Sequence, residues 1–319
     1  MKEYGGYLEF EHFSGDEYHK EAFRLNTARN ALRFIIREKK IKKIYLPDYI
    51  CPVIIDACQR ENVEIFYYPI KMDFKPDDTN VPPDEYFYFI NYYGQFDNAT
   101  IKKIHERHPH MIVDNVQAFF QRPIKTVDTI YTCRKFLGVS DGAYLYTDVA
   151  YQSYDKLCQD SSLDRLEHLV GRLEYDASTF FVKSSEMEKT FDNLDVLKMS
   201  KFTQNMLCGF DYRRICDIRT RNWQKLHEKL KGINLLNINV VEGGYMYPLM
   251  VKNASDIRKN LIKKSVYIPK LWPNEKLNQK RSPDAYKLTN DVLPLPIDQR
   301  YSENDMSYIS DLILSCILV

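Results

Sequence analysis

The stretch IVDNVQAFFQRPIKTVDTIYTCRKFLGVSDGAYLYT, residues 112–147, alternates short β-prone runs with polar turns. Ile112 and Val113 lie just before an acid, Asp114, and the run DTIY at 128–131 predicts a second strand ahead of a turn that carries Lys135. Asp114 and Lys135 therefore follow two strands. Ligands of open α/β sheets bind beyond the carboxyl ends of the strands, so these two residues mark a candidate site.

The residue types in this stretch match the needs of pyridoxal phosphate (PLP). An aldehyde cofactor needs an amine for a Schiff base, a carboxylate that keeps its pyridine nitrogen protonated, and donors for its phosphate. We predict Lys135 as the amine, Asp114 as the carboxylate, Thr132 as a phosphate-binding hydroxyl and Gln117 as a neighbour of the ring. The residues alone leave another interpretation open, in which the lysine is a solvated charge and the aspartate a cap or turn former.

The segments DNVQAF and TCRKFLGVSDGAYLYT resemble the active-site core of the fold type I PLP enzymes, and among these the sugar aminotransferases of the DegT/DnrJ type. In that family an acid-x-x-Gln segment precedes a Ser/Lys segment, and a Gly-rich turn follows. The residues that fall on these positions are Asp114, Gln117, Thr132, Lys135 and Asp141-Gly142. Thr132 replaces the usual serine and keeps its hydroxyl.

The resemblance implies a three-layer α/β PLP-transferase fold of type I, with a mostly parallel sheet and a small C-terminal α+β domain. We expect a large PLP-binding domain at 1–234 and the small domain at 235–319. The implied activity is a PLP-dependent transaminase that moves an amino group from an amino acid to a keto sugar linked to a nucleotide. The family's habit also implies a homodimer with active sites at its interface.

Composition limits the other possibilities. The chain has 319 residues, is 44% hydrophobic and carries a formal net charge of +1, which implies neither a nucleic-acid nor a membrane partner. Its seven cysteines include no CxxC pair, which argues against a disulfide framework and a compact zinc site, so we predict no metal. The N-terminus lacks an apolar signal core, and no run of about eighteen apolar residues occurs. A reducing cytoplasm is the simplest location.

The N-terminal part predicts a phosphate-binding helix start. Residues 17–43 have a helical pattern, with Asn26 and Thr27 as caps. The segment TARNAL resembles the family's SGTAAL phosphate cup, which puts Thr27, Ala28, Arg29 and Asn30 at the matching positions. We favour a charged phosphate contact for Arg29 over a solvent-facing side chain.

A strand at 43–46 leads to the turn 47–52, where the family carries the aromatic ring that stacks on the cofactor. Cys51 occupies that position here, so Tyr49 is the candidate for the ring. A further strand is expected at 63–68, and residues 86–98 are expected to form a buried strand followed by an exit loop. Helices are expected at 53–62 and 99–108, and this alternation implies a mostly parallel sheet. Tyr93 matches the family's loop on the substrate side, although ordinary packing explains it equally well.

Residues 148–234 are predicted to be mainly helical. Val196 stands where the family has an asparagine that reaches the phosphate of the partner subunit's cofactor, so Asn193 or another donor takes over, or the contact is missing. The C-terminal part predicts strands at 238–241 and 245–251 and a capped helix at 255–264. The segment VYIPKLWPNE at 266–275 and the last residues also resemble the family's C-terminal domain.

Two classes of function are left open. The first is the transaminase, and the second is a binding or scaffold protein that keeps the fold without turnover. Cys51, Val196 and the short chain support the scaffold, whereas Asp114 and Lys135 argue against it. Family members that remove a sugar hydroxyl carry histidine in place of the lysine, so Lys135 argues against that third reaction type.

Overall fold

The computed structural model describes residues 4–273 and 281–317. The strands are β1 (Phe23–Leu25), β2 (Lys43–Pro47), β3 (Glu64–Tyr68), β4 (Tyr86–Ile90), β5 (Met111–Asp114), β6 (Asp128–Thr132), β7 (Ala143–Tyr146), β8 (Met246–Met250) and β9 (Val292–Pro296). The helices are α1 (Ala28–Glu38), α2 (Pro52–Arg60), α3 (Asn98–Arg107), α4 (Tyr151–Asp155), α5 (Glu167–Glu174), α6 (Phe181–Thr190), α7 (Lys201–Leu207), α8 (Tyr212–Leu230), α9 (Ala254–Lys263), α10 (Pro283–Asp291) and α11 (Glu303–Ile317). Short 3-10 turns lie at Tyr92–Gly94 and Leu163–Arg165.

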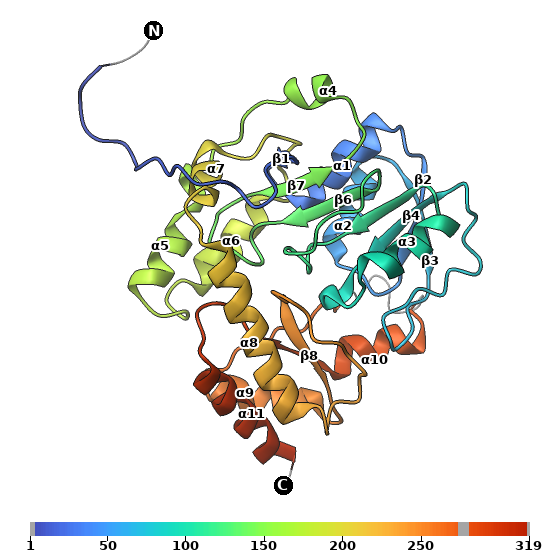
Figure 1. Ribbon diagram of the computed structural model, residues 1–319, viewed down its shortest axis with the longest axis vertical. Coiled ribbons are helices and arrows are strands. Elements are labelled where there is room, and N and C mark those ends of the chain that lie inside the picture. The colour runs from blue at the N-terminus through green and yellow to red at the C-terminus, as the bar shows by residue number, and fades with distance from the viewer. Residues whose placement is uncertain (1–3, 274–280, 318–319) are drawn as a thin grey trace.

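The larger sheet of the described residues has the strand order β1-β7-β6-β5-β4-β2-β3. β2, β3, β4, β5 and β6 are parallel, while β7 runs antiparallel to β6 and to β1 (Figure 1). The predicted, mostly parallel sheet is therefore confirmed. Helix α2 connects β2 to β3 and helix α3 connects β4 to β5, whereas loops connect β3 to β4 and β5 to β6.

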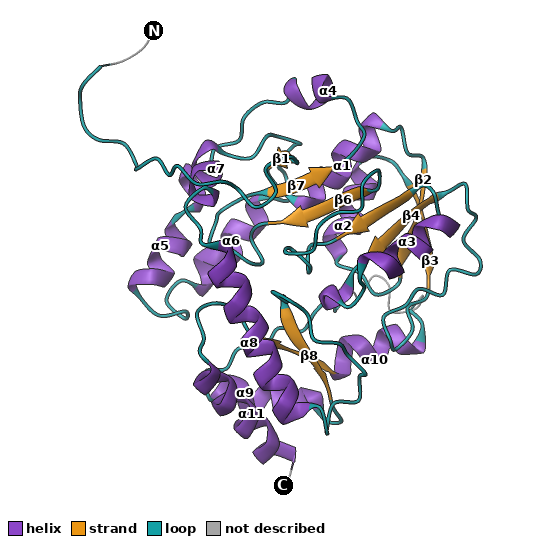
Figure 2. Ribbon diagram, in the orientation of Figure 1, coloured by secondary structure: helices purple, strands orange, loops and turns teal. Residues whose placement is uncertain are grey.

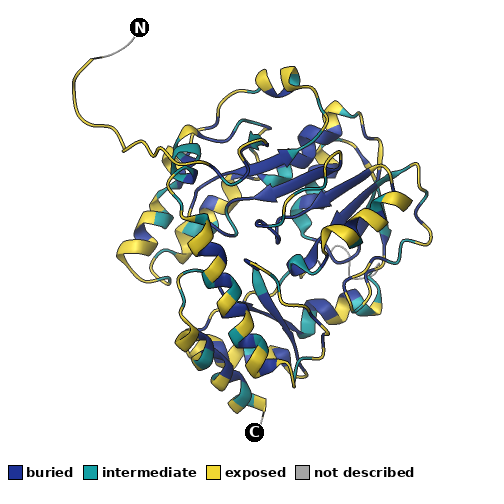
Figure 3. Cartoon of the chain, viewed as in Figure 1, coloured by how far each residue is buried: buried dark blue, intermediate teal, exposed yellow. Residues whose placement is uncertain are grey.

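Both faces of this sheet are buried, as in a three-layer fold. Neighbouring residues of β6 face opposite sides. Ile130 lies in one apolar core together with Ile35 of α1, and Tyr131 lies in a second core together with Phe119. The central strands β4, β5 and β6 are accordingly almost fully buried, whereas the flanking helices expose their outer faces to solvent (Figures 2 and 3). The predicted three-layer α/β class is confirmed.

Helix α1 begins where the sequence predicts, but the residues before it are not helical. Thr27 is the N-cap, and its hydroxyl oxygen accepts the amide hydrogen of Asn30 at 3.2 Å. The expected helix at 17–27 is wrong, because Phe23–Leu25 forms β1 against β7. Side chains before β1 are bound to the sheet as well, since the Tyr144 hydroxyl donates to Glu17 at 2.7 Å. These distant partners outweigh the local helical pattern.

The second sheet pairs β8 with β9 in antiparallel fashion, α9 and α10 pack against β9, and α11 packs against α9. The expected strand at 238–241 is wrong. The side chain of Gln95 instead bonds both backbone groups of Asn239, accepting from its N–H at 2.8 Å and donating to its carbonyl oxygen at 3.2 Å. Helix α8 packs against β8 and α11. The predicted domain boundary between residues 234 and 235 stays a prediction. Helix α8 precedes that boundary in the chain, yet it contacts β8 of the small sheet.

Candidate active site

Three neighbouring parallel strands end at one cavity of about 300 Å³. Ile90, Asp114 and Thr132 are the last residues of β4, β5 and β6, and all three line it. The cavity thus lies beyond the carboxyl ends of the strands, where ligands of such sheets bind. Its other lining residues are Thr27, Ala28, Arg29, Cys51, Val53, Ile54, Val116, Arg134, Lys135, Glu188 and Trp272.

Asp114 is a buried acid held by two donors. Its Oδ2 accepts from the hydroxyl of Tyr88 at 2.8 Å, and its Oδ1 accepts from the amide of Val116 at 2.9 Å. Burial raises the pKa of Asp114, and the positive charge of Lys135 works against that rise. The carboxylate is therefore kept in the cavity wall opposite a cation and is not a surface cap.

The turn that carries Lys135 is held in place by hydrogen bonds to Phe136, the residue after the lysine. The carbonyl oxygen of Phe136 accepts from the Arg219 guanidinium at 3.2 Å and from the Gln299 amide at 2.8 Å. Arg219 also donates to the carbonyl oxygens of Gly244 and Tyr245. Burial lowers the pKa of Arg219 to about 10. Since Arg219 lies on α8, this helix ties the Lys135 turn to the start of the small sheet.

The amine of Lys135 lies 5.4 Å from the ring centroid of Tyr245. Burial lowers the pKa of Lys135, and the carboxylate of Asp114 opposes this shift. A lysine amine with a lowered pKa is more often neutral and is a better nucleophile at physiological pH. The structure thus brings the predicted amine and the predicted acid to the same cavity.

The start of α1 supplies the anion-binding part of the cavity. Thr27, Ala28 and Arg29 line it, and the first amides of a helix lack acceptors within the helix. The Thr27 hydroxyl uses its oxygen for the cap, which leaves its own hydrogen to donate. Asn30 is different. Its side chain donates to the carbonyl oxygen of Asp195 at 2.8 Å and accepts from Arg33, so it braces the loop after α6.

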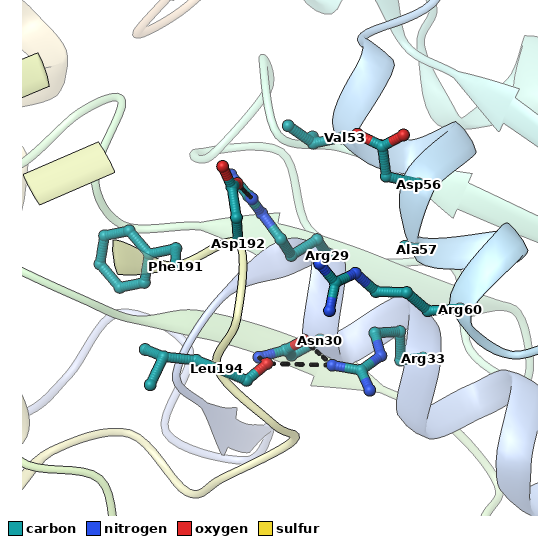
Figure 4. A pocket seen from close by; sticks show the side chains of 10 residues that line it. All are labelled: Arg29, Asn30, Arg33, Val53, Asp56, Ala57, Arg60, Phe191, Asp192 and Leu194. Carbon is teal, nitrogen blue, oxygen red and sulfur yellow. Dashed lines mark hydrogen bonds and ion pairs between the residues drawn. The ribbon is translucent and has the colours of Figure 1, made fainter. Parts of the chain in front are cut away.

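Arg29 stands between two cavities. A second cavity of about 290 Å³ shares Arg29 and Val53 with the first and is also lined by Arg33 and Arg60 (Figure 4). There Arg29 points toward Asp192, and its Nη1 lies 2.6 Å from an oxygen of that carboxylate. Its side chain is 17% exposed and that of Asp192 is 55% exposed. The predicted phosphate-binding guanidinium is therefore neither solvent-facing nor free, because it is held by an exposed acid.

Three other predicted residues, Gln117, Tyr93 and Tyr49, are not among the described lining residues of the cavity. Gln117 accepts the amide hydrogen of Tyr93 at 2.7 Å, and its buried Nε2 has no partner among the described residues. Tyr93 is buried with a ring 5.5 Å from that of Phe74. Tyr49 stacks on Tyr92 at 5.3 Å. These contacts describe packing around the cavity.

Cys51 and Trp272 occupy the wall where the sequence leaves the stacking ring in doubt. Trp272 lines the cavity and meets the ring of Tyr49 edge-on at 4.7 Å. Burial raises the pKa of the Cys51 thiol. Of the residues considered for the contact with a partner's phosphate, Val196 is buried and Asn193 is exposed. Asn274 and Glu275 of the C-terminal resemblance lie outside the described residues.

Four residues at or next to the cavity were not predicted from the sequence: Tyr88, Arg134, Glu188 and Trp272. Two of them carry a sequence signal that could have identified them. Arg134 is the chain neighbour of Lys135, and Tyr88 lies two positions before the end of a buried strand, on the sheet face that also bears Asp114. No local pattern marks Glu188 or Trp272, which reach the cavity from distant segments.

The residues present fit PLP. The cavity offers an amine at Lys135, a buried carboxylate at Asp114, hydroxyls at Thr27 and Thr132, and a guanidinium at Arg29. Within residues 4–273 and 281–317, no group of three or more His, Cys, Asp or Glu side chains could hold a metal ion. The same ranges contain no helix that is both long and apolar enough to cross a membrane.

No protein-family model matches the chain, and no curated protein matches its sequence. Solved structures do share its fold. The DegT DnrJ EryC1 StrS aminotransferase of Brucella abortus has a TM-score of 0.67 at 12% identity, covering 95% of this chain and 91% of that one. The PMP form of Spr1654 from Streptococcus pneumoniae has a TM-score of 0.69 at 12% identity, covering 95% and 92%. DesI, crystallised in the presence of its TDP-sugar product, has a TM-score of 0.67 at 14% identity, covering 92% and 80%. The predicted fold of the sugar aminotransferases is thereby confirmed.

The electrostatic coupling of Lys135 to Asp114 gives a prediction that needs no cofactor. The carboxylate favours the charged ammonium, so Asp114→Asn should lower the pKa of Lys135 further. We expect the pH midpoint for acetylation of Lys135 by acetic anhydride, followed by peptide mass spectrometry, to move to lower pH in the variant. Acetylation of the exposed Lys102 should not respond. An unchanged or higher midpoint for Lys135 would show that the two groups are not coupled.

Proposed function

We propose that this protein is a PLP-dependent aminotransferase that moves an amino group from an amino acid to a keto sugar linked to a nucleotide. The observation that carries the proposal is the meeting of Lys135 and the buried Asp114 in one cavity, beside the start of α1. An amine, an acid and an anion-binding helix start are the three parts that the cofactor requires.

Each lining residue has a separate task in this proposal. When bound, PLP supplies an electron sink that stabilises negative charge at the substrate carbon. The Nζ of Lys135 would hold the aldehyde group of the cofactor, and as a free amine it would move a proton as a general base. Asp114 keeps the proton on the ring nitrogen. Thr27, Ala28, Arg29 and Thr132 bind the phosphate.

The acceptor and donor are inferred from the fold's relatives. DesI was crystallised with its TDP-sugar product, which supports a sugar attached to a nucleotide. Spr1654 has been seen in a PMP form, which supports an amino group carried by the cofactor. Tyr93 is kept as a proposed substrate-side residue on the family resemblance alone, since it is buried and is not among the described lining residues of the cavity.

We also infer a homodimer located in a reducing cytoplasm. All seven cysteines are free, which fits that compartment. A group of apolar side chains around α5 and α6 is exposed, which supports a covering partner. These exposed side chains are Leu163, Val170, Leu173, Tyr175, Phe181 and Val182.

The second candidate function is a PLP-fold binding protein without turnover. Cys51 lines the cavity at the position where the family carries an aromatic ring, and this observation favours the alternative. Trp272 in the same wall weakens it, because a ring is available from another segment. Covalent attachment to Lys135 is the first requirement of the enzyme, and it can be tested directly.

The purified protein saturated with PLP should absorb in the near-ultraviolet or visible range. Borohydride should then fix the cofactor to one lysine, because reduction converts the carbon–nitrogen double bond into a stable amine. Peptide mass spectrometry should find the adduct at Lys135, and none should form in Lys135→Arg. An adduct on another lysine, or none in the unaltered protein, would sink the assignment.

Asp192 competes with the cofactor phosphate for Arg29, so we expect substitutions of Arg29 and of Asp192 to change PLP affinity in opposite directions. Arg29→Ala should raise the dissociation constant of PLP by about tenfold or more, since a charged hydrogen bond contributes roughly 1.5 to 3 kcal/mol. Asp192→Asn should lower it by about two- to fivefold, because an exposed pair is worth roughly 0 to 1 kcal/mol and would no longer compete. Fluorescence titration with PLP measures both values.

Arg37→Ala is the matched control, because Arg37 lies on the same helix and its guanidinium is bound to Glu61 and Asp195, away from the cavity. Its PLP affinity should equal that of the unaltered protein. Equal PLP affinities for the unaltered protein and the three variants would mean that Arg29 only pairs with Asp192 and does not bind the cofactor phosphate.

A further inference from the structure

Both arginines that line the Lys135 cavity are neutralised by acids of one segment, residues 187–192. Arg29 pairs with Asp192, and Arg134 pairs with Glu188. The two guanidiniums are similarly shielded, with side chains 17% and 18% exposed, whereas the acids are 55% and 51% exposed. Each of these two half-buried guanidiniums is thus paired with an acid that solvent can reach. Such an acid is a weak partner, because water and salt screen it.

Arg134 is held in place independently of Glu188. Its guanidinium carbon lies 4.3 Å from the ring centroid of Phe191, which is buried. Arg165 lies on the same ring at 5.2 Å. Within the described residues, the hydrogen bonds of Arg134 go to Glu188 and, at 3.9 Å, to the sulfur of Met187. A guanidinium has five N–H donors, so donors remain for a ligand even while Glu188 is bound.

The position of this pair suits a ligand that enters from solvent. Arg134 and Glu188 both line the cavity, and Arg134 is next to Lys135 in the chain. Thr27, Ala28 and Arg29 line the cavity from a different segment, at the start of α1. The cavity wall carries three cations, Arg29, Arg134 and Lys135, and two acids, Asp114 and Glu188. If Glu188 leaves Arg134, the wall gains a positive charge close to the reacting amine.

We infer that Arg134 forms a second anion subsite of this cavity, which binds a carboxylate or phosphate group of the substrate, and that Glu188 occupies the subsite in the free protein. The inference rests on the proposed function, because it assigns the anion to a substrate of that reaction. An amino donor would supply a carboxylate, and a nucleotide sugar would supply a diphosphate. Both present oxygens that a guanidinium binds in a bidentate manner.

The test measures binding to the PLP-saturated protein by calorimetry, with two probes that cannot undergo transamination. Succinate represents the carboxylate source, and uridine diphosphate represents the phosphate source. Arg134→Gln should weaken at least one probe by about tenfold or more, as expected for loss of a charged hydrogen bond. Arg134→Lys should restore part of the loss. Glu188→Gln should increase the affinity for the same probe by about threefold, because the Glu188 carboxylate no longer competes for Arg134.

The matched controls are Arg172→Gln on α5 and Glu186→Gln on α6, both at exposed positions outside the cavity lining. Neither should change the affinity for succinate or uridine diphosphate. The opposite signs expected for Arg134 and Glu188 protect the test against general unfolding, since a damaged protein would not bind more tightly. The probe that responds identifies the source of the anion.

Unchanged binding of both probes in Arg134→Gln and Glu188→Gln would overturn the inference. So would a loss of PLP affinity in Arg134→Gln with unchanged probe binding, because Arg134 would then serve the cofactor phosphate. If the unaltered protein does not take up PLP, the proposed function fails separately. Titration of the cofactor-free protein and of its Arg134→Gln variant with succinate and with uridine diphosphate would then still decide whether an Arg134-dependent anion subsite exists.

Discussion

The parallel pairing of β4, β5 and β6 is the constraint on which the site depends. Ile90 pairs with Asp114, and Asp114 pairs with Ile130, so the three strands end close to one another at the same edge. Parallel pairing places all their carboxyl ends at one cavity, whose wall is completed by the start of α1. A slip of one residue would turn Asp114 to the other face of the sheet and remove it from Tyr88.

Charge is balanced in this cavity by partners of different strength. Asp114 is buried and Lys135 is half-buried, and each shifts the pKa of the other toward its charged form. Arg29 and Arg134 are instead balanced by half-exposed acids. A ligand anion can replace an exposed acid at little cost, whereas it cannot easily replace Asp114. Asp114 and Lys135 are therefore suited to hold the reacting groups, and the ion pairs of Arg29 and Arg134 are suited to open when a ligand anion binds.

The parts of the site that local sequence determines could be predicted. Asp114 and Lys135 follow strands in one continuous stretch, and Thr27 caps a helix with a clear apolar face. What depends on distant segments could not be predicted. β1 exists because β7 pairs with it, and Glu188 reaches Arg134 from a helix more than fifty residues away. No spacing rule encodes such contacts, which form only when the chain has folded.

The central claim is that Lys135 works as a base in an aminotransferase, and the most direct test is the spectrum of the PLP-loaded protein after L-glutamate is added. A positioned base contributes about a hundredfold to ten-thousandfold in rate. The account predicts conversion of the PLP absorption to that of pyridoxamine phosphate within minutes, and no conversion in Lys135→Ala. If PLP is bound yet no conversion occurs with glutamate, other amino acids or a panel of amino sugars, the account is contradicted and the binding-protein function is preferred.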